Sequence, residues 1–227
     1  MNTQNTVQNN AVALRTRLRQ ERAALPADQR SRDGLLMRAR LSTWLNVARD
    51  EALRAGQDAP SRVAAFWPME DEPDLRPLLE QWFENGISIS LPVIVAANAA
   101  LEFRLWRPDT AMQAGRYGIL EPQSGTAVRP DIILVPTLGY TYNADRLGYG
   151  GGYYDRTLAA LKADGHACTT IGVAWSGGLL NEDYRPAEHD VRLNAILTPD
   201  GWVPQAPLST APAPDSKPGS LGTFTLN

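Results

Sequence analysis

The chain is poor in several features that define familiar protein classes. Cys168 is the single cysteine in 227 residues, which excludes an intrachain disulfide framework and is typical of a reducing compartment. No segment approaches the ~18 consecutive apolar residues that a membrane-spanning helix needs. Residues 1–10 are polar and lack the apolar core of a signal peptide. We therefore expect a soluble, cytoplasmic protein that does not enter a membrane.

Lysine is almost absent, because positive charge comes from arginine everywhere except at Lys162 and Lys217. The formal net charge of -3 gives no general attraction to nucleic acid or to an anionic membrane, so neither is an expected partner. Neither lysine lies beside a glycine cluster, which excludes the P-loop motif, and the glycines also lack the G-x-G-x-x-G spacing of dinucleotide-binding folds. Two common nucleotide-binding motifs are therefore missing.

The most informative segment is residues 146–156, which read Arg-Leu-Gly-Tyr-Gly-Gly-Gly-Tyr-Tyr-Asp-Arg. Glycines let a backbone approach a ligand closely, because no Cβ stands in the way. Tyr154, Leu158 and Leu161 recur at helical spacing, so the loop leads into a helix N-terminus, whose free N–H groups and dipole suit phosphate. Asp155 supplies a carboxylate for the Mg²⁺ that accompanies phosphate chemistry. The alternative is a mobile loop in solvent.

The remaining pattern predicts a single α/β domain over residues 11–203. Residues 1–10 and the Pro-, Ser-, Ala- and Gly-rich residues 204–227 are expected to be disordered. Helical patterns cover residues 12–25, 28–54 and 74–84, with Asp74 as the N-cap of the third. Strands are expected at residues 62–67, 87–93, 101–106, 131–136, 169–175 and 194–197. This order favours an open, mostly parallel sheet with helices on both faces.

Three loops are expected to converge at one edge of that sheet. The glycine-rich loop follows the strand at 132–135, the segment 67–72 follows the strand at 63–66, and the loop ending in Glu188-His189-Asp190 follows the strand at 171–175. Ligands in open α/β sheets bind beyond the carboxyl ends of the strands. We therefore expect one cleft bounded by these three loops.

The chain resembles the 5-formyltetrahydrofolate cyclo-ligase (methenyltetrahydrofolate synthetase) family from about Ala11 to Pro199. The glycine-rich segment 146–156 is highly specific to that family. Weaker segments agree in order and spacing: Arg-Ala-Ala-Leu (22–25), Pro-Met-Glu-Asp-Glu-Pro-Asp-Leu-Arg-Pro-Leu (68–78), Tyr-Gly-Ile-Leu-Glu-Pro (117–122) and Glu-His-Asp-Val-Arg-Leu (188–193). The resemblance implies a three-layer α/β/α sandwich related to the NagB/RpiA/CoA-transferase-like group.

The resemblance also implies the reaction and its residues. The family uses ATP to close 5-formyltetrahydrofolate into 5,10-methenyltetrahydrofolate, by phosphorylation of the formyl oxygen and attack by N10, with release of ADP and phosphate. Carried over by position, Arg146 and Tyr153 are catalytic, and Asp155 and Asp190 hold Mg²⁺. ATP is expected to contact Arg15, Arg146, Leu147, Gly148, Tyr149, Gly150, Gly151, Gly152, Tyr153 and Tyr154. The folate is expected to contact Trp67, Glu72, Tyr149, Gly150, Gly151, Gly152 and Tyr153.

The chain departs from the family pattern at several positions. Ala11 stands where the family often has a lysine that touches ATP phosphate, so Arg17 or Arg19 is expected to replace it or the contact is absent. Thr137 replaces a common glycine and Thr141 a common aspartate. Asn194 also stands where aspartate is common, which is why we assign the metal to Asp190.

Each assigned residue has a structural alternative. Arg15 can lie on a solvated helix face, Glu72 can cap a helix, and Asp190 can stabilise a turn. Tyr153 can belong to the core and Trp67 can pack at a strand end. His189 is expected to be buried and hydrogen-bonded rather than catalytic, and Cys168 to be structural.

Two other functions compete with the cyclo-ligase reaction. A folate-binding protein that has lost ATP use through the Ala11 change would keep the fold and the Glu72 pocket. A phosphotransferase acting on another acceptor would use the same glycine-rich loop. We expect a monomer with 5-formyltetrahydrofolate and ATP as its binding partners.

Overall fold

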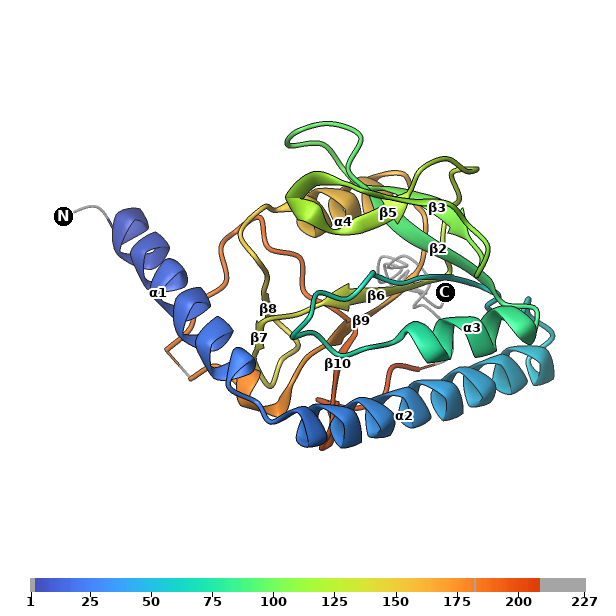
Figure 1. Cartoon of the computed structure of the whole chain (residues 1–227), viewed down its shortest axis with the longest axis horizontal. Coiled ribbons are helices and arrows are strands. Elements are labelled where there is room, and N and C mark those ends of the chain that lie inside the picture. The colour runs from blue at the N-terminus through green and yellow to red at the C-terminus, as the bar shows by residue number, and fades with distance from the viewer. Residues whose placement is uncertain (1–2, 182, 209–227) are drawn as a thin grey trace, which may run out of the picture.

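A seven-stranded sheet forms the centre of the computed structural model, which describes residues 3–181 and 183–208 (Figure 1). The strand order is β11-β10-β9-β6-β1-β2-β3. The five inner strands are parallel, whereas β3 pairs antiparallel with β2 and β11 antiparallel with β10. The strands are β1 (Arg62–Ala64), β2 (Ser88–Val93), β3 (Glu102–Trp106), β6 (Ile132–Pro136), β9 (Thr169–Val173), β10 (Ala195–Thr198) and β11 (Gly201–Val203). The predicted open, mostly parallel sheet is confirmed.

Helices cover both faces of this sheet (Figure 1). Helices α2 (Ala27–Arg54) and α3 (Arg76–Glu84) pack on one face, and α4 (Tyr153–Ala163) packs on the other. Alternate residues of the strands serve the two layers, as a pleated sheet requires. Ile132 and Leu134 of β6 face α2 and α3, whereas Ile133 and Val135 face α4. The expected α/β class with two helical layers is thereby confirmed.

The sequence pattern locates α2 almost to the residue. Pro26 has φ -58° and stands at the N-cap, where its missing N–H costs no hydrogen bond. Met37, Leu41, Trp44 and Ala48 then recur at helical spacing and are buried against the sheet. This apolar stripe explains why the helix packs along the sheet from Gly34 to Ala52.

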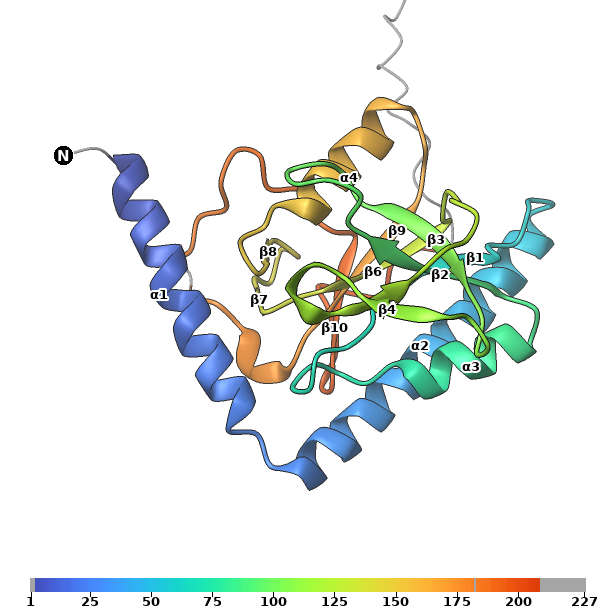
Figure 2. The ribbon, with the colours of Figure 1, turned by 45° about the horizontal axis from the view of Figure 1, so that its top comes forward.

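Helix α1 (Thr3–Ala23) stands apart from the three layers (Figure 2). Its buried Leu18 contacts Leu138, Leu147 and Leu180, which belong to the loops at the carboxyl edge of the sheet. The helix begins at Thr3 and so includes residues 3–10, for which the composition had indicated disorder. Residues 3–10 are polar, so apolar periodicity, which requires apolar residues at helical spacing, could not predict this part of the helix.

The expected disordered tail, residues 204–227, lies mostly outside the described residues, from 209 onward. Residues 204–208 depart from the expectation, because the Trp44 indole N–H donates to the Pro207 carbonyl (2.9 Å) and Ala206 packs on the core. The polar composition of the tail gave no sign of this contact, which depends on Trp44 from the distant α2.

Short strands escaped the sequence pattern. They are β4 (Met112–Ala114) with β5 (Leu120–Pro122), and β7 (Gly139–Tyr140) with β8 (Arg146–Leu147), besides β11 at the sheet edge. Two or three residues are too few to show alternation. The strand expected at 62–67 ends at Ala64. Within the described residues, no helix is long and apolar enough to cross a membrane.

Candidate active site

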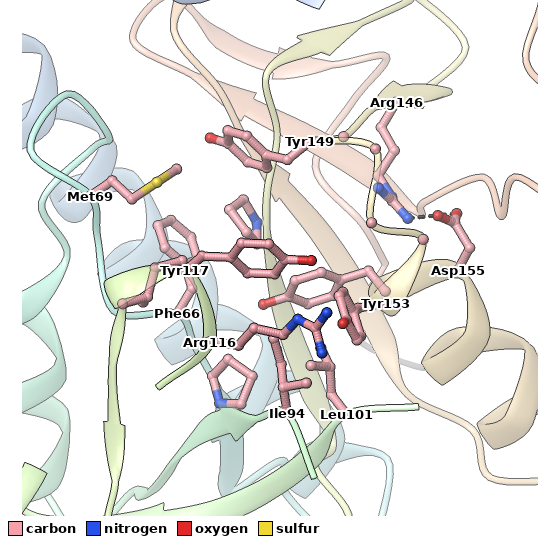
Figure 3. A pocket seen from close by; sticks show the side chains of 18 of the residues that line it. Phe66, Met69, Ile94, Leu101, Arg116, Tyr117, Arg146, Tyr149, Tyr153 and Asp155 are labelled. Carbon is pink, nitrogen blue, oxygen red and sulfur yellow. Dashed lines mark hydrogen bonds and ion pairs between the residues drawn. The ribbon is translucent and has the colours of Figure 1, made fainter. Parts of the chain in front are cut away.

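A cavity of about 530 Å³ opens at the carboxyl edge of the sheet. It lies between α1, the loop after β1, the β4–β5 hairpin and the glycine-rich loop before α4 (Figure 3). Its volume is typical of a site for small organic ligands. All residues that the sequence assigned to a site line it: Arg15, Trp67, Glu72, Arg146, Leu147, Gly148, Tyr149, Gly150, Gly151, Gly152, Tyr153, Tyr154, Asp155 and Asp190.

The glycine-rich loop follows β8 and places its backbone against the cavity. Gly150 has φ +94°, and Gly152, the N-cap of α4, has φ +63°. A Cβ on Gly150 would lie 3.4 Å from Cζ of Arg15. Residues with side chains rarely adopt such φ values, so the backbone conformation favours glycine at both positions. The loop delivers the α4 N-terminus to the cavity with its first N–H groups free of helical partners.

Two arginines of α1, one helical turn apart, hold this loop. Arg15 donates from Nε to the Gly148 carbonyl (2.9 Å), and Arg19 donates to the Tyr149 carbonyl (3.4 Å). Both side chains line the cavity. Arg15 is half-buried, which rules out the alternative of a solvated helix face. Arg17 points elsewhere, since it is exposed and pairs with Glu21 at 3.5 Å. Of the two candidates to replace the missing lysine, only Arg19 reaches the cavity.

A buried ion pair lies beneath the loop. Arg146 donates to Asp155 Oδ1 at 2.6 Å, and the same oxygen accepts the Val191 N–H at 3.1 Å (Figure 3). Nε of Arg146 and the Tyr154 hydroxyl are both buried and have no hydrogen-bond partner among the described residues. Burial raises the pKa of Tyr154, so its hydroxyl stays protonated. The Arg146 Nε–H and the Tyr154 hydroxyl are therefore one charged and one neutral donor that a ligand in the cavity can engage.

The loop carrying Asp190 closes the same end of the cavity. Asp190 Oδ2 accepts the Ala187 N–H (2.8 Å), so the side chain does stabilise a turn while it also lines the cavity. The expectation that His189 is buried is wrong, because its side chain is 79% exposed. The apolar residue that reaches the core from this loop is Leu193. The Val191 N–H donates to Asp155, so the residue after Asp190 contacts the other predicted metal ligand.

Glu72 belongs to the loop after β1 and is buried with charged and polar partners. Its Oε2 accepts the Met69 N–H (2.8 Å), and its Oε1 accepts the Tyr149 hydroxyl in a very short hydrogen bond. Burial raises the pKa of Glu72, although these hydrogen bonds and the charge of Arg22 act in the opposite direction. Glu72 precedes α3 by four positions and does not cap it. Asp74 accepts the Arg76 N–H but lies one residue before the N-cap, Leu75.

Aromatic side chains form the wall opposite the ion pair (Figure 3). The rings of Tyr117 and Tyr153 meet edge to face with centroids 6.4 Å apart. Tyr117 and Arg116 come from the β4–β5 hairpin, and Tyr117 is 68% exposed. Trp67 lines the cavity and also packs on Trp106, with centroids 6.1 Å apart. The segment 117–122 matched the family by sequence, but no role for Tyr117 was predicted, because an exposed tyrosine in a short hairpin carries no distinguishing pattern.

The carboxylates fit Mg²⁺ of the kind that nucleotides bring. Mg²⁺ commonly takes one or two carboxylates and completes its octahedron with phosphate oxygens and water. Asp155 and Asp190 satisfy that requirement, whereas no group of three or more potential ligand side chains occurs among residues 3–181 and 183–208. Asn194 instead accepts the Thr170 N–H (2.7 Å) and lies outside the cavity lining, which agrees with its exclusion as a ligand.

Comparisons with known proteins place the chain among folate enzymes. The pattern of the 5-formyltetrahydrofolate cyclo-ligase family matches residues 7–199. The 5-formyltetrahydrofolate cyclo-ligase of Mycolicibacterium smegmatis is 34% identical over 199 residues, which cover 82% of this chain and 92% of the relative. The Escherichia coli K12 enzyme of the same name is 29% identical over 188 residues, covering 80% and 96%.

A solved structure agrees in fold with this chain. The 5,10-methenyltetrahydrofolate synthetase of Aquifex aeolicus superposes with a TM-score of 0.70 at 24% identity, covering 85% of this chain and 91% of that one. The likeness therefore extends over most of both chains.

Proposed function

Since this chain belongs to the 5-formyltetrahydrofolate cyclo-ligase family, we propose that its carboxyl-edge cavity converts 5-formyltetrahydrofolate and ATP into 5,10-methenyltetrahydrofolate, ADP and phosphate. One observation carries the proposal. Residues from α1, the loop after β1, the glycine-rich loop and the Asp190 loop, which were assigned to ATP, the folate or Mg²⁺, all line that one cavity. A reaction between two bound molecules requires such a shared site.

The phosphates of ATP bind at the glycine-rich loop. The α4 N-terminus offers free N–H groups and the positive end of the helix dipole. Arg15 and Arg19 add positive charge from α1. Arg19 takes the role of the lysine that the family often has at the position of Ala11. Arg146 lies at the base of the loop with Nε available to a phosphate oxygen.

The folate binds between Glu72 and the aromatic wall. A carboxylate is an acceptor pair, which matches the adjacent amino group and N–H of a pterin ring. Tyr117 and Tyr153 offer ring faces and edges to the flat parts of the substrate, and Trp67 extends the apolar surface. The phosphate end and the folate end of the cavity then meet at Tyr153, which both substrates contact.

The chemistry follows from this placement. The formyl oxygen attacks the γ-phosphorus and ADP leaves, which converts a poor leaving group into a phosphate ester. N10 then attacks the formyl carbon, the C–O bond breaks with departure of phosphate, and N10 loses its proton. Arg146 stabilises negative charge that develops on the transferred phosphoryl group, in a cavity whose walls lower the dielectric. Tyr153 fixes the formyl group beside that phosphoryl group.

Asp155 and Asp190 hold Mg²⁺ in this proposal. The ion supplies charge neutralisation on the ATP phosphates. Asp155 is oriented for this by Arg146 and by the Val191 N–H, both of which bind Oδ1.

The proposal also includes a monomer in the cytoplasm, where ATP and reduced folates occur together. Burial raises the pKa of the Cys168 thiol to about 11, which suits a structural cysteine in a reducing compartment.

Methenyl formation, followed by the near-ultraviolet absorbance of the product, tests the function. We expect turnover of 5-formyltetrahydrofolate only with ATP and Mg²⁺ together. Folate binding without ATP-dependent product would instead identify a folate-binding protein. Release of ADP without 5-formyltetrahydrofolate would identify a phosphotransferase that acts on another acceptor. Gel filtration with light scattering tests the monomer.

A further inference from the structure

Arg22 on α1 is a buried arginine to which the reaction above gives no role. Its side chain is only 7% exposed. It donates from Nε and from one terminal nitrogen to the two oxygens of Asp71, both at 2.8 Å, in a bidentate pair. The other terminal nitrogen donates to the Tyr149 hydroxyl at 2.5 Å. Each of the three guanidinium nitrogens thus donates a hydrogen bond, which fixes the side chain in position.

The hydrogen bonds continue from Tyr149 to Glu72. The Tyr149 hydroxyl accepts from Arg22 and therefore turns its single proton toward Oε1 of Glu72. Oε2 is held by the Met69 N–H. A directed chain thus runs from Asp71 through Arg22 and Tyr149 to Glu72. The chain joins α1, the glycine-rich loop and the loop after β1, three segments that are distant in sequence.

We propose that Arg22 is a positioning residue: it holds the Tyr149 hydroxyl, which in turn orients the Glu72 carboxylate for the folate. The inference rests on the proposed role of Glu72 in substrate binding. Arg22 itself does not line the cavity, so it acts through its neighbours. Tyr149 is the intermediate because its hydroxyl hydrogen-bonds both groups, whereas Arg22 and Oε1 of Glu72 are 3.9 Å apart, beyond hydrogen-bond distance.

The same groups set the protonation of Glu72. The groups that face it are Arg22 from α1, Asp71 from its own loop, Tyr149 from the glycine-rich loop and Tyr154 from α4. Burial raises the pKa of Glu72, whereas the Tyr149 hydrogen bond and the Arg22 charge favour the carboxylate. Loss of either contact therefore moves the pKa of Glu72 further up.

Direct binding of 5-formyltetrahydrofolate, measured by calorimetry from pH 5 to pH 9 without ATP, tests this chain of contacts. Tyr149→Phe removes one hydroxyl and leaves the Arg22–Asp71 pair intact. We expect the Kd to rise about tenfold at pH 7. We also expect affinity to begin to fall at a higher pH than in the wild type, because the raised pKa of Glu72 makes it protonate at higher pH. A purely structural role would weaken binding equally at every pH.

Arg22→Lys keeps the positive charge but loses the bidentate fork, and we expect a smaller shift in the same direction. Tyr142→Phe and Arg17→Lys are the matched controls, since Tyr142 is exposed outside the cavity and Arg17 is exposed on the same helix. Neither should change the Kd or its pH dependence. Thermal unfolding verifies that each variant folds.

A double-mutant cycle separates this inference from the role of Glu72 itself. Glu72→Gln alone should weaken binding and abolish the pH dependence that Glu72 causes. If it does not, the assignment of Glu72 fails, and the positioning role of Arg22 fails with it. If Glu72→Gln weakens binding but Tyr149→Phe costs as much in the Glu72→Gln background as in the wild type, the hydroxyl acts elsewhere and only the inference is overturned.

Discussion

Two cavities of nearly equal size lie at opposite edges of the sheet, at about 530 Å³ on the carboxyl edge and about 520 Å³ on the amino edge. The amino-edge cavity is lined where β1, β6 and β9 begin, including Arg62, Asp131 and Thr169. The carboxyl-edge cavity carries every residue assigned to ATP, the folate or Mg²⁺. Volume therefore does not distinguish the active site from its counterpart.

The difference lies in how each cavity satisfies its polar groups. At the amino edge, Asp131 accepts the N–H groups of Ser61 and Arg62 and the Arg62 guanidinium, so its oxygens serve the fold. At the carboxyl edge, Arg146 and Tyr154 keep buried donors without partners among the described residues. Buried donors without partners are costly, so a protein retains them where a ligand completes them.

The largest difference between the two cavities should appear when Arg146 at the carboxyl edge and Arg62 at the amino edge are each replaced. Arg146→Met leaves Asp155 as a buried charge without its partner, so we expect unfolding free energy to fall by about 3 kcal/mol. Turnover should fall about 10²–10³-fold, because a donor to the transferred phosphoryl group is lost. Chemical denaturation and the methenyl assay measure the two effects.

Arg62→Met is the control, since Arg62 is 48% exposed and its pair with Asp131 is worth at most about 1 kcal/mol. Arg146→Met combined with Asp155→Leu should recover stability without activity. Full activity in the single Arg146→Met variant would remove Arg146 from the phosphate site.

An intermediate contrast compares two glycines with positive φ. Gly150→Ala forces a side chain into a φ of +94° beside Arg15, so we expect the glycine-rich loop to shift and the KM for ATP to rise about tenfold. Gly86→Ala, at φ +78° in open space after α3, imposes similar backbone strain far from the cavity. Its KM for ATP should be unchanged. Equal effects of the two substitutions would show that strain, and not the phosphate site, determines the result.

The smallest effect is expected at Asp131. Burial acts to raise the pKa of Asp131, but hydrogen bonds from Arg62 and Ser61 outweigh it and hold the pKa below its ordinary value. Asp131 therefore contributes stability above its unfolded pKa, and this contribution is lost as pH falls through the folded pKa. Asp131→Asn should lower the unfolding free energy by about 1 kcal/mol at pH 7, with no change in turnover. The difference from wild type should shrink below pH 4, and a constant difference would contradict the linkage.

The two edges also differ in how far the sequence revealed them. The composition of the glycine-rich segment 146–156 predicted a ligand site, since clustered glycines before a helical pattern have few uses other than close approach to a ligand. Buried strands such as Ile132–Pro136 were also predicted, from their continuous apolar runs. Tyr117 and Arg22 carried no such sign, because an exposed tyrosine in a short hairpin and an arginine in an arginine-rich helix look like ordinary surface residues.

The α/β class, the parallel sheet and the glycine-rich loop could be predicted from the amino-acid sequence, because apolar periodicity and glycine clustering are local properties of the chain. Three findings needed the folded chain: Arg19 and not Arg17 faces the cavity, Asp155 is paired with Arg146, and Arg22 is linked to Glu72 through Tyr149. Arg146 and Asp155 are only nine positions apart, whereas the contacts of Arg19 and Arg22 join α1 to segments far apart in sequence. Their geometry depends on how α1 docks against the loops, which no local pattern encodes.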